Sequence, residues 1–334
     1  MIRAAIVGLG RWGRRLVDSV QRDGVPLGDG IRFTHAVVRT TELVRGYATA
    51  QRLNIASDLD AALADPAVDA IVLATPHTQH RDQVVRAAAA RKPVFVEKPF
   101  ALTKADAEIA ANACARAGIV LAVGHNRRFL PALRDLKAMI ASGALGTVLH
   151  VEANFSGAWG FDYQPGMWRA AAEESPAGGM TGLGIHLIDA FIYLNGAIAS
   201  VSTQGSRRIF PSVMDDTTVV TMRFANGAIA NLVTMMATAR IWRLQAFGTK
   251  GWVHLRDHHI VERAMVGGDV ETITYPEVDI ERAELEAFAD AIGGRAPYPV
   301  PIAEVVHGVA VMEASIAGVE RAGEVIAVDS TLFS

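Results

Sequence analysis

Short apolar runs alternate with segments of helical periodicity over roughly the first 124 residues. Each run is rich in β-branched residues and ends at a glycine, a proline or a polar residue, which is typical of a buried parallel strand. Strands are expected at Ile2–Val7, Arg32–Val38, Asp69–Thr75, Val94–Glu97 and Ile119–Gly124. The helices predicted between them, such as residues 81–91, imply a doubly wound parallel sheet with helices on both faces.

The pattern changes after Gly124. A helix is expected from Pro131 to about Ser142, and strict alternation then predicts strands. The expected strands cover residues 148–155, 198–206, 217–224, 228–236, 243–248, 252–255, 260–265 and 271–275. Asn226-Gly227 between two alternating runs is a strong hairpin signal. Helices are expected at Ile280–Ile292 and Ile302–Ala322.

The chain is therefore predicted to be an α/β protein with two domains. Residues 1–123 form the parallel-sheet domain, and residues 124–334 form an α+β domain with an open, mostly antiparallel sheet. The last helices are free to pack back on the first domain. One face of the open sheet lacks a cover, so a homodimer or homotetramer is expected to form through it.

Composition and charge narrow the class of protein. Of 334 residues, 51% are hydrophobic and the net charge is -3, which disfavours disorder, nucleic-acid binding and anionic membrane surfaces. Cys114 is the only cysteine, so no intramolecular disulfide forms, and its alanine-rich surroundings suggest a buried helix residue. No targeting segment or apolar stretch of membrane-spanning length is evident, and a cytoplasmic location is expected.

A glycine-rich turn follows the first strand. Gly8, Gly10 and Gly13 form G-x-G-x-x-G, with Arg11 and Trp12 between the last two glycines, and a helical pattern follows directly. In this setting the glycines allow a tight turn, close approach of a pyrophosphate and close helix packing. The motif predicts dinucleotide binding at the helix N-terminus.

The end of the second strand carries no acidic residue that could bind both ribose hydroxyls. Arg39 offers a cation and Thr40 a hydroxyl, which suit a 2′-phosphate, so NADP is favoured and NAD stays possible. The alternative is a surface arginine followed by a threonine helix cap. The next strand ends at Thr75-Pro76, where small side chains let a cofactor pass closely; His80 either caps the following helix, the favoured role, or lines the cleft.

The strand at residues 94–97 ends abruptly at Glu97-Lys98-Pro99. A lysine partly stripped of water at the carboxyl end of a buried strand can exchange protons near neutral pH. Lys98 is the first catalytic candidate, with a solvated lysine as the alternative.

A helix interrupts the β-rich region from Met180 to Leu194. Its interior Gly182 and Gly184 imply close approach by something bulky, and periodicity places His186, Asp189 and Tyr193 in one row. His186 is the second catalytic candidate, although a lone helix histidine is more often structural.

Together, these motifs resemble the Gfo/Idh/MocA family of nicotinamide-dependent oxidoreductases over nearly the whole chain. The resemblance implies a Rossmann domain to about residue 123, a cis bond before Pro99 that directs Lys98, and oligomers formed through the open sheet. It also implies that Trp168 and Arg169 lie near the nicotinamide or substrate. Asn126 and Arg128, at the entry to the second domain, are further candidate contacts of the cofactor or substrate. The arginines there are compatible with an acidic substrate. A solvated arginine cluster is the competing interpretation.

One departure from the family pattern is Gly182, which stands where the family carries an aspartate. The leading hypothesis is hydride transfer between NADP(H) and a carbinol or carbonyl carbon of a sugar, polyol, sugar acid or cyclic hemiacetal. Lys98 and His186 act as acid–base groups, with Asp189 or Tyr193 supporting or lining the site. Two alternatives remain: an NADP-binding sensor without redox turnover, and a lyase or epimerase with a tightly held nucleotide.

No metal site is expected, since the adjacent His258 and His259 are interpreted as strand residues on opposite faces.

Overall fold

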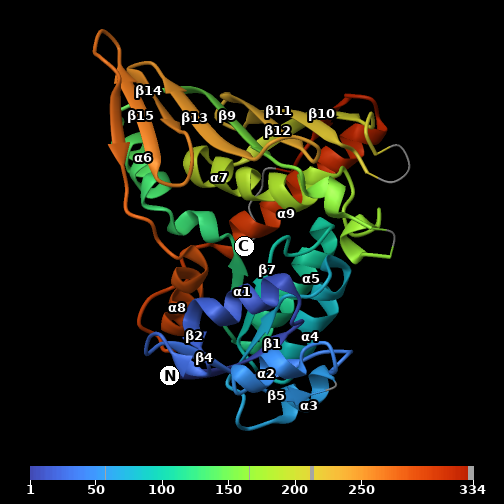
Figure 1. The fold of residues 1–334 in the computed structure, drawn as a ribbon. Coiled ribbons are helices and arrows are strands. Elements are labelled where there is room, and N and C mark those ends of the chain that lie inside the picture. Colours follow the sequence, from blue (N-terminus) through green and yellow to red (C-terminus); the bar gives the residue numbers. More distant parts are fainter. Residues whose placement is uncertain (57, 165, 211–213, 330–334) are drawn as a thin grey trace. The chain divides into compact units, whose positions relative to one another are not determined.

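The computed structural model describes residues 1–56, 58–164, 166–210 and 214–329 (Figure 1). Its contacts divide the chain into two compact units. The first comprises Met1–Ala101, Ala105–Asn126 and Asp279–Ile302. The second comprises Leu102–Lys104, Arg127–Val278 and Ala303–Ser334, of which residues 330–334 lie outside the described part.

The first unit contains a six-stranded, wholly parallel sheet. Its strands are β1 (Ile2–Val7), β4 (Ile31–Val37), β5 (Asn54–Ala56), β6 (Ala70–Leu73), β7 (Val94–Glu97) and β8 (Leu121–Gly124). They lie in the order β5-β4-β1-β6-β7-β8, which is the Rossmann order. This confirms the predicted doubly wound sheet. The short β5 and the hairpin of β2 (Gln21–Arg22) and β3 (Val25–Pro26) were not predicted.

The helices of this sheet are α1 (Arg11–Val20), α2 (Arg45–Ala50), α3 (Leu59–Ala64), α4 (His80–Ala89) and α5 (Lys104–Ala117), with the 3₁₀ turn η1 (His77–Gln79). Helix α2 is shorter than the pattern at residues 42–53 predicted. It ends at Ala50, with Gln51 as its C-cap. The next residue, Arg52, has a left-handed backbone with φ 55°, which cannot continue a right-handed helix.

Helix α8 (Ile280–Ile292) also belongs to the first unit, although the sequence placed its residues after the domain boundary. It packs against α1, and its Leu285 and Phe288 are fully buried in the core around β1 and β4. The Phe288 ring lies 5.8 Å from the ring of Phe95 on β7. Apolar burial of these side chains anchors α8 to the parallel sheet.

The second unit is built on a nine-stranded sheet in the order β16-β15-β14-β13-β9-β12-β11-β10-β17. Its strands are β9 (Val148–Ser156), β10 (Ile198–Ser206), β11 (Thr217–Phe224), β12 (Ile229–Met235), β13 (Ile241–Gly248), β14 (Gly251–Leu255), β15 (Ile260–Met265), β16 (Glu271–Thr274) and β17 (Val325–Ala327). The β9–β12 pair is parallel and the other pairs are antiparallel, which confirms the predicted mostly antiparallel sheet.

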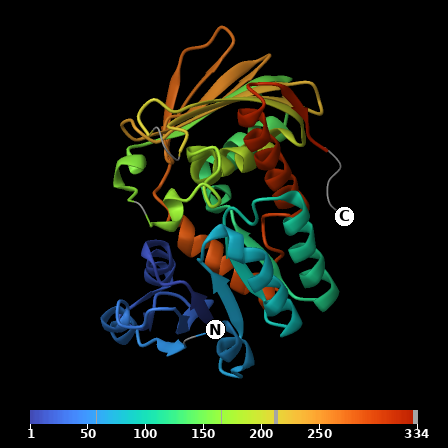
Figure 2. The same ribbon diagram turned by 90° about the vertical axis from the view of Figure 1, so that its right-hand side faces the viewer.

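Helices of the second unit cover one face of this sheet. They are α6 (Pro131–Ala141), α7 (Ile185–Asn195) and α9 (Ile302–Glu320), with short turns η2 (Asn126–Phe129), η3 (Trp159–Asp162), η4 (Trp168–Ala170) and η5 (Met180–Gly184). In both views no described helix lies on the opposite face (Figures 1 and 2). On β11 the buried residues Val220, Met222 and Phe224 alternate with more exposed ones, as expected for a sheet covered on one side.

Helix α9 corrects one prediction. Among the described residues it is long and apolar enough, by length and composition, to cross a membrane, whereas the sequence was interpreted as lacking any such stretch. Most of its apolar window, 61%, is buried inside the protein. The core helix of a folded domain meets the same criteria, because it too is apolar on nearly every side.

Candidate functional site

The glycine-rich turn has the geometry that close packing requires. Gly8 has φ +91°, and an added Cβ would lie 2.6 Å from the Ala74 carbonyl oxygen. At Gly13 a Cβ would lie 2.0 Å from the Gly8 carbonyl oxygen, so the helix approaches the strand as closely as glycine allows. No atom lies within 4 Å of the corresponding point at Gly10. The turn is therefore closed by Gly8 and Gly13 and open at Gly10.

The N-terminus of α1 is suited to an anion. A shallow cavity of about 530 Å³ beside it is lined by Gly10, Arg11, Arg14, Arg15 and others. The helix has no acidic residue in its first turn and no side-chain cap, so its free N–H groups and positive end are available. These residues fit a dinucleotide pyrophosphate. At the end of β4, Arg39 and Thr40 are both exposed.

The predicted capping role of His80 is wrong. His80 is the first residue of α4, is fully buried, and its ring nitrogens lie 2.9 Å from the Pro99 carbonyl oxygen and 3.1 Å from that of Thr75. The Thr75 hydroxyl donates to Gln83. His80 thus ties the two strand-end segments together, and its contact with a cofactor stays a prediction.

The segment Glu97-Lys98-Pro99 closes strand β7 with a cis Lys98–Pro99 bond. Glu97 is 6% exposed, and burial raises the pKa of its carboxyl group to about 7. The charge of Lys98 and its backbone N–H, which donates to the Glu97 carboxylate at 3.3 Å, oppose this rise, whereas the charge of Glu281 adds to it. A carboxyl group that exchanges its proton near neutral pH therefore sits beside the predicted catalytic lysine.

Glu281 connects this segment to α8, and no sequence motif pointed to it. The Asn126 amide donates to the Glu281 carboxylate at 3.0 Å, and Arg15 of α1 donates to the same carboxylate at 2.7 Å. Arg15 also pairs with Asp279 at 3.1 Å. Asn126, a predicted cofactor and substrate contact, is 1% exposed. Residues 15, 126 and 281 are too far apart in sequence for any local pattern to reveal this network.

In the second unit, His186 on α7 contacts Arg127. The guanidinium lies 3.2 Å from Nε2 of His186, both side chains are buried, and Arg127 also lies 5.4 Å from the centre of the Phe155 ring. A guanidinium only donates hydrogen bonds, so the imidazole nitrogen facing it must present its lone pair. The same guanidinium nitrogen lies 3.5 Å from Nδ1 of His186, so Arg127 contacts both ring nitrogens and helps to fix the position of the imidazole.

Asp189 and Tyr193 are brought together around Arg128. The guanidinium donates to both Asp189 oxygens, with a shortest distance of 2.7 Å, pairs with Glu304 of α9 at 2.6 Å, and stacks 4.8 Å from the Tyr193 ring centre. Burial alone would lower the pKa of Arg128, but the two carboxylates raise it above its usual value. The buried pair ties helices together, and substrate contacts by Arg128, Asp189 and Tyr193 stay predictions.

The segment preceding α7 is a π-helix, η5, which the sequence did not predict. An added Cβ at Gly184 would lie 2.2 Å from the Met180 sulfur, so glycine is needed here to let the Met180 side chain pack closely. Apart from its chain neighbours and its own helix, no described residue has an atom within 4 Å of the Cβ position of Gly182, so the close approach of something bulky there stays a prediction. Single π-turns within helices are frequent at functional sites.

The remaining candidates lie in turns. Trp168 and Arg169 are neighbours on η4, with the Arg169 guanidinium 4.0 Å from the Trp168 ring centre. His258 and His259 precede β15 in a turn, so the interpretation of both as strand residues is wrong. The Asp257 carboxylate there accepts bonds from the backbone N–H groups of His259 and Ile260, which fold the chain into that turn. No group of three metal-binding side chains occurs among the described residues.

Comparison with known proteins assigns both halves of the chain. Residues 2–125 match a model described as an oxidoreductase family with an NAD-binding Rossmann fold. Residues 133–254 match the GFO/IDH/MocA C-terminal domain.

Individual relatives cover most of the chain. It is 28% identical to scyllo-inositol 2-dehydrogenase (NAD(+)) of Bacillus subtilis, over 90% of this chain and 89% of the relative. It is 27% identical to 2,7-anhydro-N-acetylneuraminate hydratase of Escherichia coli, over 84% of this chain and 74% of the relative. A solved levoglucosan dehydrogenase with NADH and levoglucosan has a TM-score of 0.87 at 20% identity, over 98% of this chain and 99% of the other, which shows a common fold.

Proposed function

Because the chain belongs to the Gfo/Idh/MocA oxidoreductase family and is an NAD(P)-dependent enzyme, we propose that it transfers a hydride to or from a carbinol or carbonyl carbon of a small hydroxylated substrate. Sugars, polyols, sugar acids and cyclic hemiacetals are the proposed substrate class. The names of the inositol and levoglucosan dehydrogenases support this class. The observation that carries the proposal is Lys98, placed beside a buried carboxyl group at the end of β7 in a dinucleotide-binding sheet.

The protein supplies proton transfer and orientation in this reaction. The nicotinamide supplies the hydride chemistry when it is bound. Lys98 is proposed to exchange the proton of the reacting hydroxyl, and His186 to hydrogen-bond or relay at the same oxygen. Arg127 supports the second role, because its contacts with both ring nitrogens hold the His186 imidazole in place.

NADP is the proposed cofactor, with NAD as the alternative. The exposed Arg39 and Thr40 at the end of β4 support a 2′-phosphate contact. Titration of the protein with NADPH and NADH, followed by the fluorescence of the reduced nicotinamide, measures the preference directly. Tighter binding of NADH than of NADPH would refute the proposed preference for NADP.

Replacement of Lys98 tests the catalytic assignment. The Lys98→Met variant is expected to bind the reduced cofactor normally and to lose about 10²–10⁴-fold in kcat, because general acid–base catalysis contributes that much. The measurement pairs nucleotide titration with a dehydrogenase assay over a panel of polyols, sugars and sugar acids.

Lys250→Met is the matched control. The Lys250 side chain is exposed and its ammonium group donates to the Gly143 carbonyl oxygen at 3.2 Å, so its replacement should leave kcat unchanged. Full turnover by Lys98→Met would refute the acid–base assignment.

A second candidate is a lyase or epimerase that holds the nucleotide through oxidation and re-reduction of the substrate. The named hydratase among the relatives and Gly182 at the usual carboxylate position favour it. Substrate conversion without net change in nicotinamide absorbance would support this candidate. Tight nucleotide binding with no conversion of any substrate would instead support the sensor hypothesis.

A further inference from the structure

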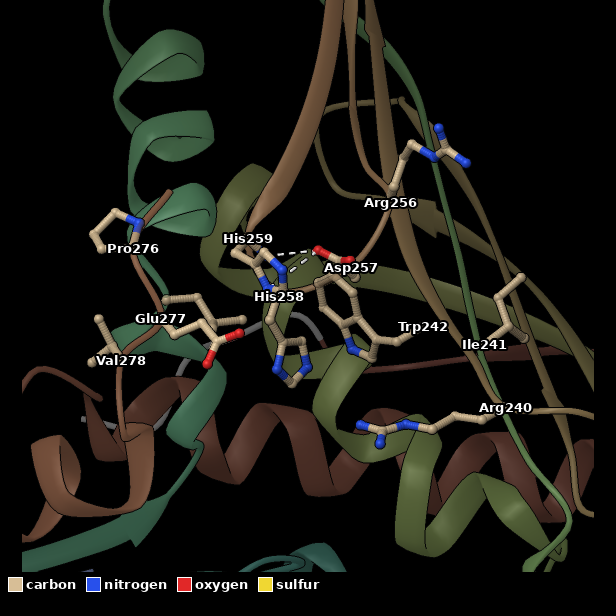
Figure 3. A pocket seen from close by; sticks show the side chains of 11 residues that line it. Arg240, Ile241, Trp242, Arg256, Asp257, His258, His259, Pro276, Glu277 and Val278 are labelled. Carbon is tan, nitrogen blue, oxygen red and sulfur yellow. Dashed lines mark hydrogen bonds and ion pairs between the residues drawn. The ribbon is translucent and has the colours of Figure 1, made fainter. Parts of the chain in front are cut away.

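The second unit contains a cavity of about 490 Å³ that sequence reasoning did not predict (Figure 3). Four separate segments form its wall: Leu130 just before α6, residues 240–242 at the start of β13, the turn between β14 and β15, and the chain after β16. This volume lies in the range of small-molecule sites. The polar side chains that carry the argument are Arg240, Trp242, Arg256, His258 and Glu277.

Trp242 supplies a buried donor at the cavity wall. The residue is 5% exposed, and its indole N–H has no hydrogen-bond partner among the described residues. Its ring meets the His258 imidazole edge to face, with centres 4.9 Å apart. A buried donor without an acceptor is costly, so an acceptor on a bound molecule would be favoured there after a small side-chain shift.

The two arginines of the cavity differ in direction. The guanidinium of Arg240 points toward the space below His258, whereas that of Arg256 points away (Figure 3). Arg256 is paired with Glu262 at 2.9 Å. Arg240 is the cation directed into the cavity, and Arg256 offers a charge-matched comparison in the same wall.

His258 completes this end of the cavity as a neutral group. Burial, together with the charges of Arg127 and Arg240, lowers the pKa of its imidazole to about 4, while the charge of Asp257 opposes this shift. The nearby Arg127 also orients His186, so the cavity adjoins the histidine end of the proposed site within the same unit. A neutral imidazole carries one N–H group, so it can donate a hydrogen bond to an anion without first binding a second proton.

We propose that this cavity is the subsite for the acidic group of a carboxylated sugar. The carboxylate is bound at the end formed by Arg240, Trp242 and His258, and the carboxylate of Glu277 on the opposite side accepts bonds from substrate hydroxyls (Figure 3). The inference deepens the proposed function and rests on it, because it specifies sugar acids within the proposed substrate class.

Direct binding tests the subsite without depending on turnover. The probes are D-glucuronate, D-glucose as its neutral counterpart and glucose 6-phosphate as a phosphate-bearing one, titrated by calorimetry into the NADPH-bound protein. Wild-type protein is expected to bind glucuronate in preference to glucose. Arg240→Gln and Trp242→Phe should weaken glucuronate binding about tenfold or more, as loss of a hydrogen bond to a charged group implies.

Arg256→Gln is the matched control and should leave the affinity unchanged. Equal affinity for glucose and glucuronate, binding of neither, or equal losses in Arg240→Gln and Arg256→Gln would overturn the subsite. Preference for glucose 6-phosphate over glucuronate would show that the subsite binds a phosphate and would overturn the proposed carboxylate. Oxidation of neutral polyols, followed by nicotinamide absorbance in the same preparations, tests the proposed function on its own. This activity can persist even when the subsite proposal fails.

Discussion

Glu97 lies in an environment that is unusual for a carboxyl group. It follows three apolar strand residues, is buried like them, and carries a carboxyl group whose pKa burial raises to about 7. The charges of Glu97 and Lys98 influence each other, so an ionised Glu97 favours the ammonium form of Lys98. Proton transfer by the lysine should therefore depend on its neighbour.

A Glu97→Gln variant should change the pH dependence of stability. The folded protein holds the Glu97 proton up to about pH 7, whereas the unfolded chain releases it near 4.5, so the wild-type free energy of unfolding falls as pH rises between these values. The variant should lose this slope. Urea denaturation at a series of pH values measures it, with the exposed Glu320→Gln as a control that keeps the slope.

The same variant separates a positioning role from a merely structural one. Without a carboxylate beside it, Lys98 gives up its proton more readily, so the acidic limb of kcat for alcohol oxidation should move to lower pH. If neither the acidic limb of the kcat profile nor the pH dependence of the free energy of unfolding changed, Glu97 would be shown not to act on Lys98.

At the scale of elements, buried ion pairs decide how the helices of the second unit pack. Arg128 joins η2 to Asp189 of α7 and Glu304 of α9, and the Arg128 and Asp189 side chains are 2% and 3% exposed. Such a pair is costly to break, because the remaining charge stays buried without its counter-ion.

Asp189→Asn is therefore expected to destabilise the protein by about 3 kcal/mol. Asp290→Asn breaks the Arg295–Asp290 pair, whose side chains are 58% and 45% exposed, and should cost about 1 kcal/mol or less. Chemical denaturation of both variants gives the comparison. Similar losses would mean that Asp189 contributes little beyond an exposed pair and would reopen its assignment as a substrate ligand.

For the whole molecule, the bare face of the nine-stranded sheet is the main unexplained surface. Its strand register places Ile229, His150, Phe247 and Trp252 in one row, and the neighbouring Ala230, Ala246 and Val253 point to the buried face. A mixed apolar row of this kind supports the proposal that two copies of the chain associate through this face.

We expect sedimentation of the purified protein to show at least a dimer, and Phe247→Glu to shift it toward the monomer, because a charge in an apolar interface is left without a partner. Val266→Glu, at a turn residue that is 79% exposed, is the control and should leave assembly unchanged. A monomeric wild-type protein at micromolar concentration would refute this mode of association.

The parts predicted well from sequence are those that short-range chemistry specifies. The strand at Val94–Glu97 has its predicted bounds, and the hairpin at Asn226-Gly227 joins β11 and β12 with Gly227 at φ +93°. The π-helix at residues 180–184 was missed because its glycines fit an α-helix with interior flexibility equally well. His80 was misassigned because its acceptors at Thr75 and Pro99 are carbonyl oxygens, which leave no pattern in side-chain sequence.

The sequence alone determined the alternating parallel sheet, the glycine turn, the position of Lys98 and the open second sheet, because periodicity and backbone requirements act over a few residues. Only the tertiary structure decided that Arg127 orients His186, that Glu281 joins Asn126 to Arg15, and that four distant segments line the Arg240–Trp242–His258 cavity. Burial and charge pairing between residues far apart in the chain set these features, and no local pattern records them.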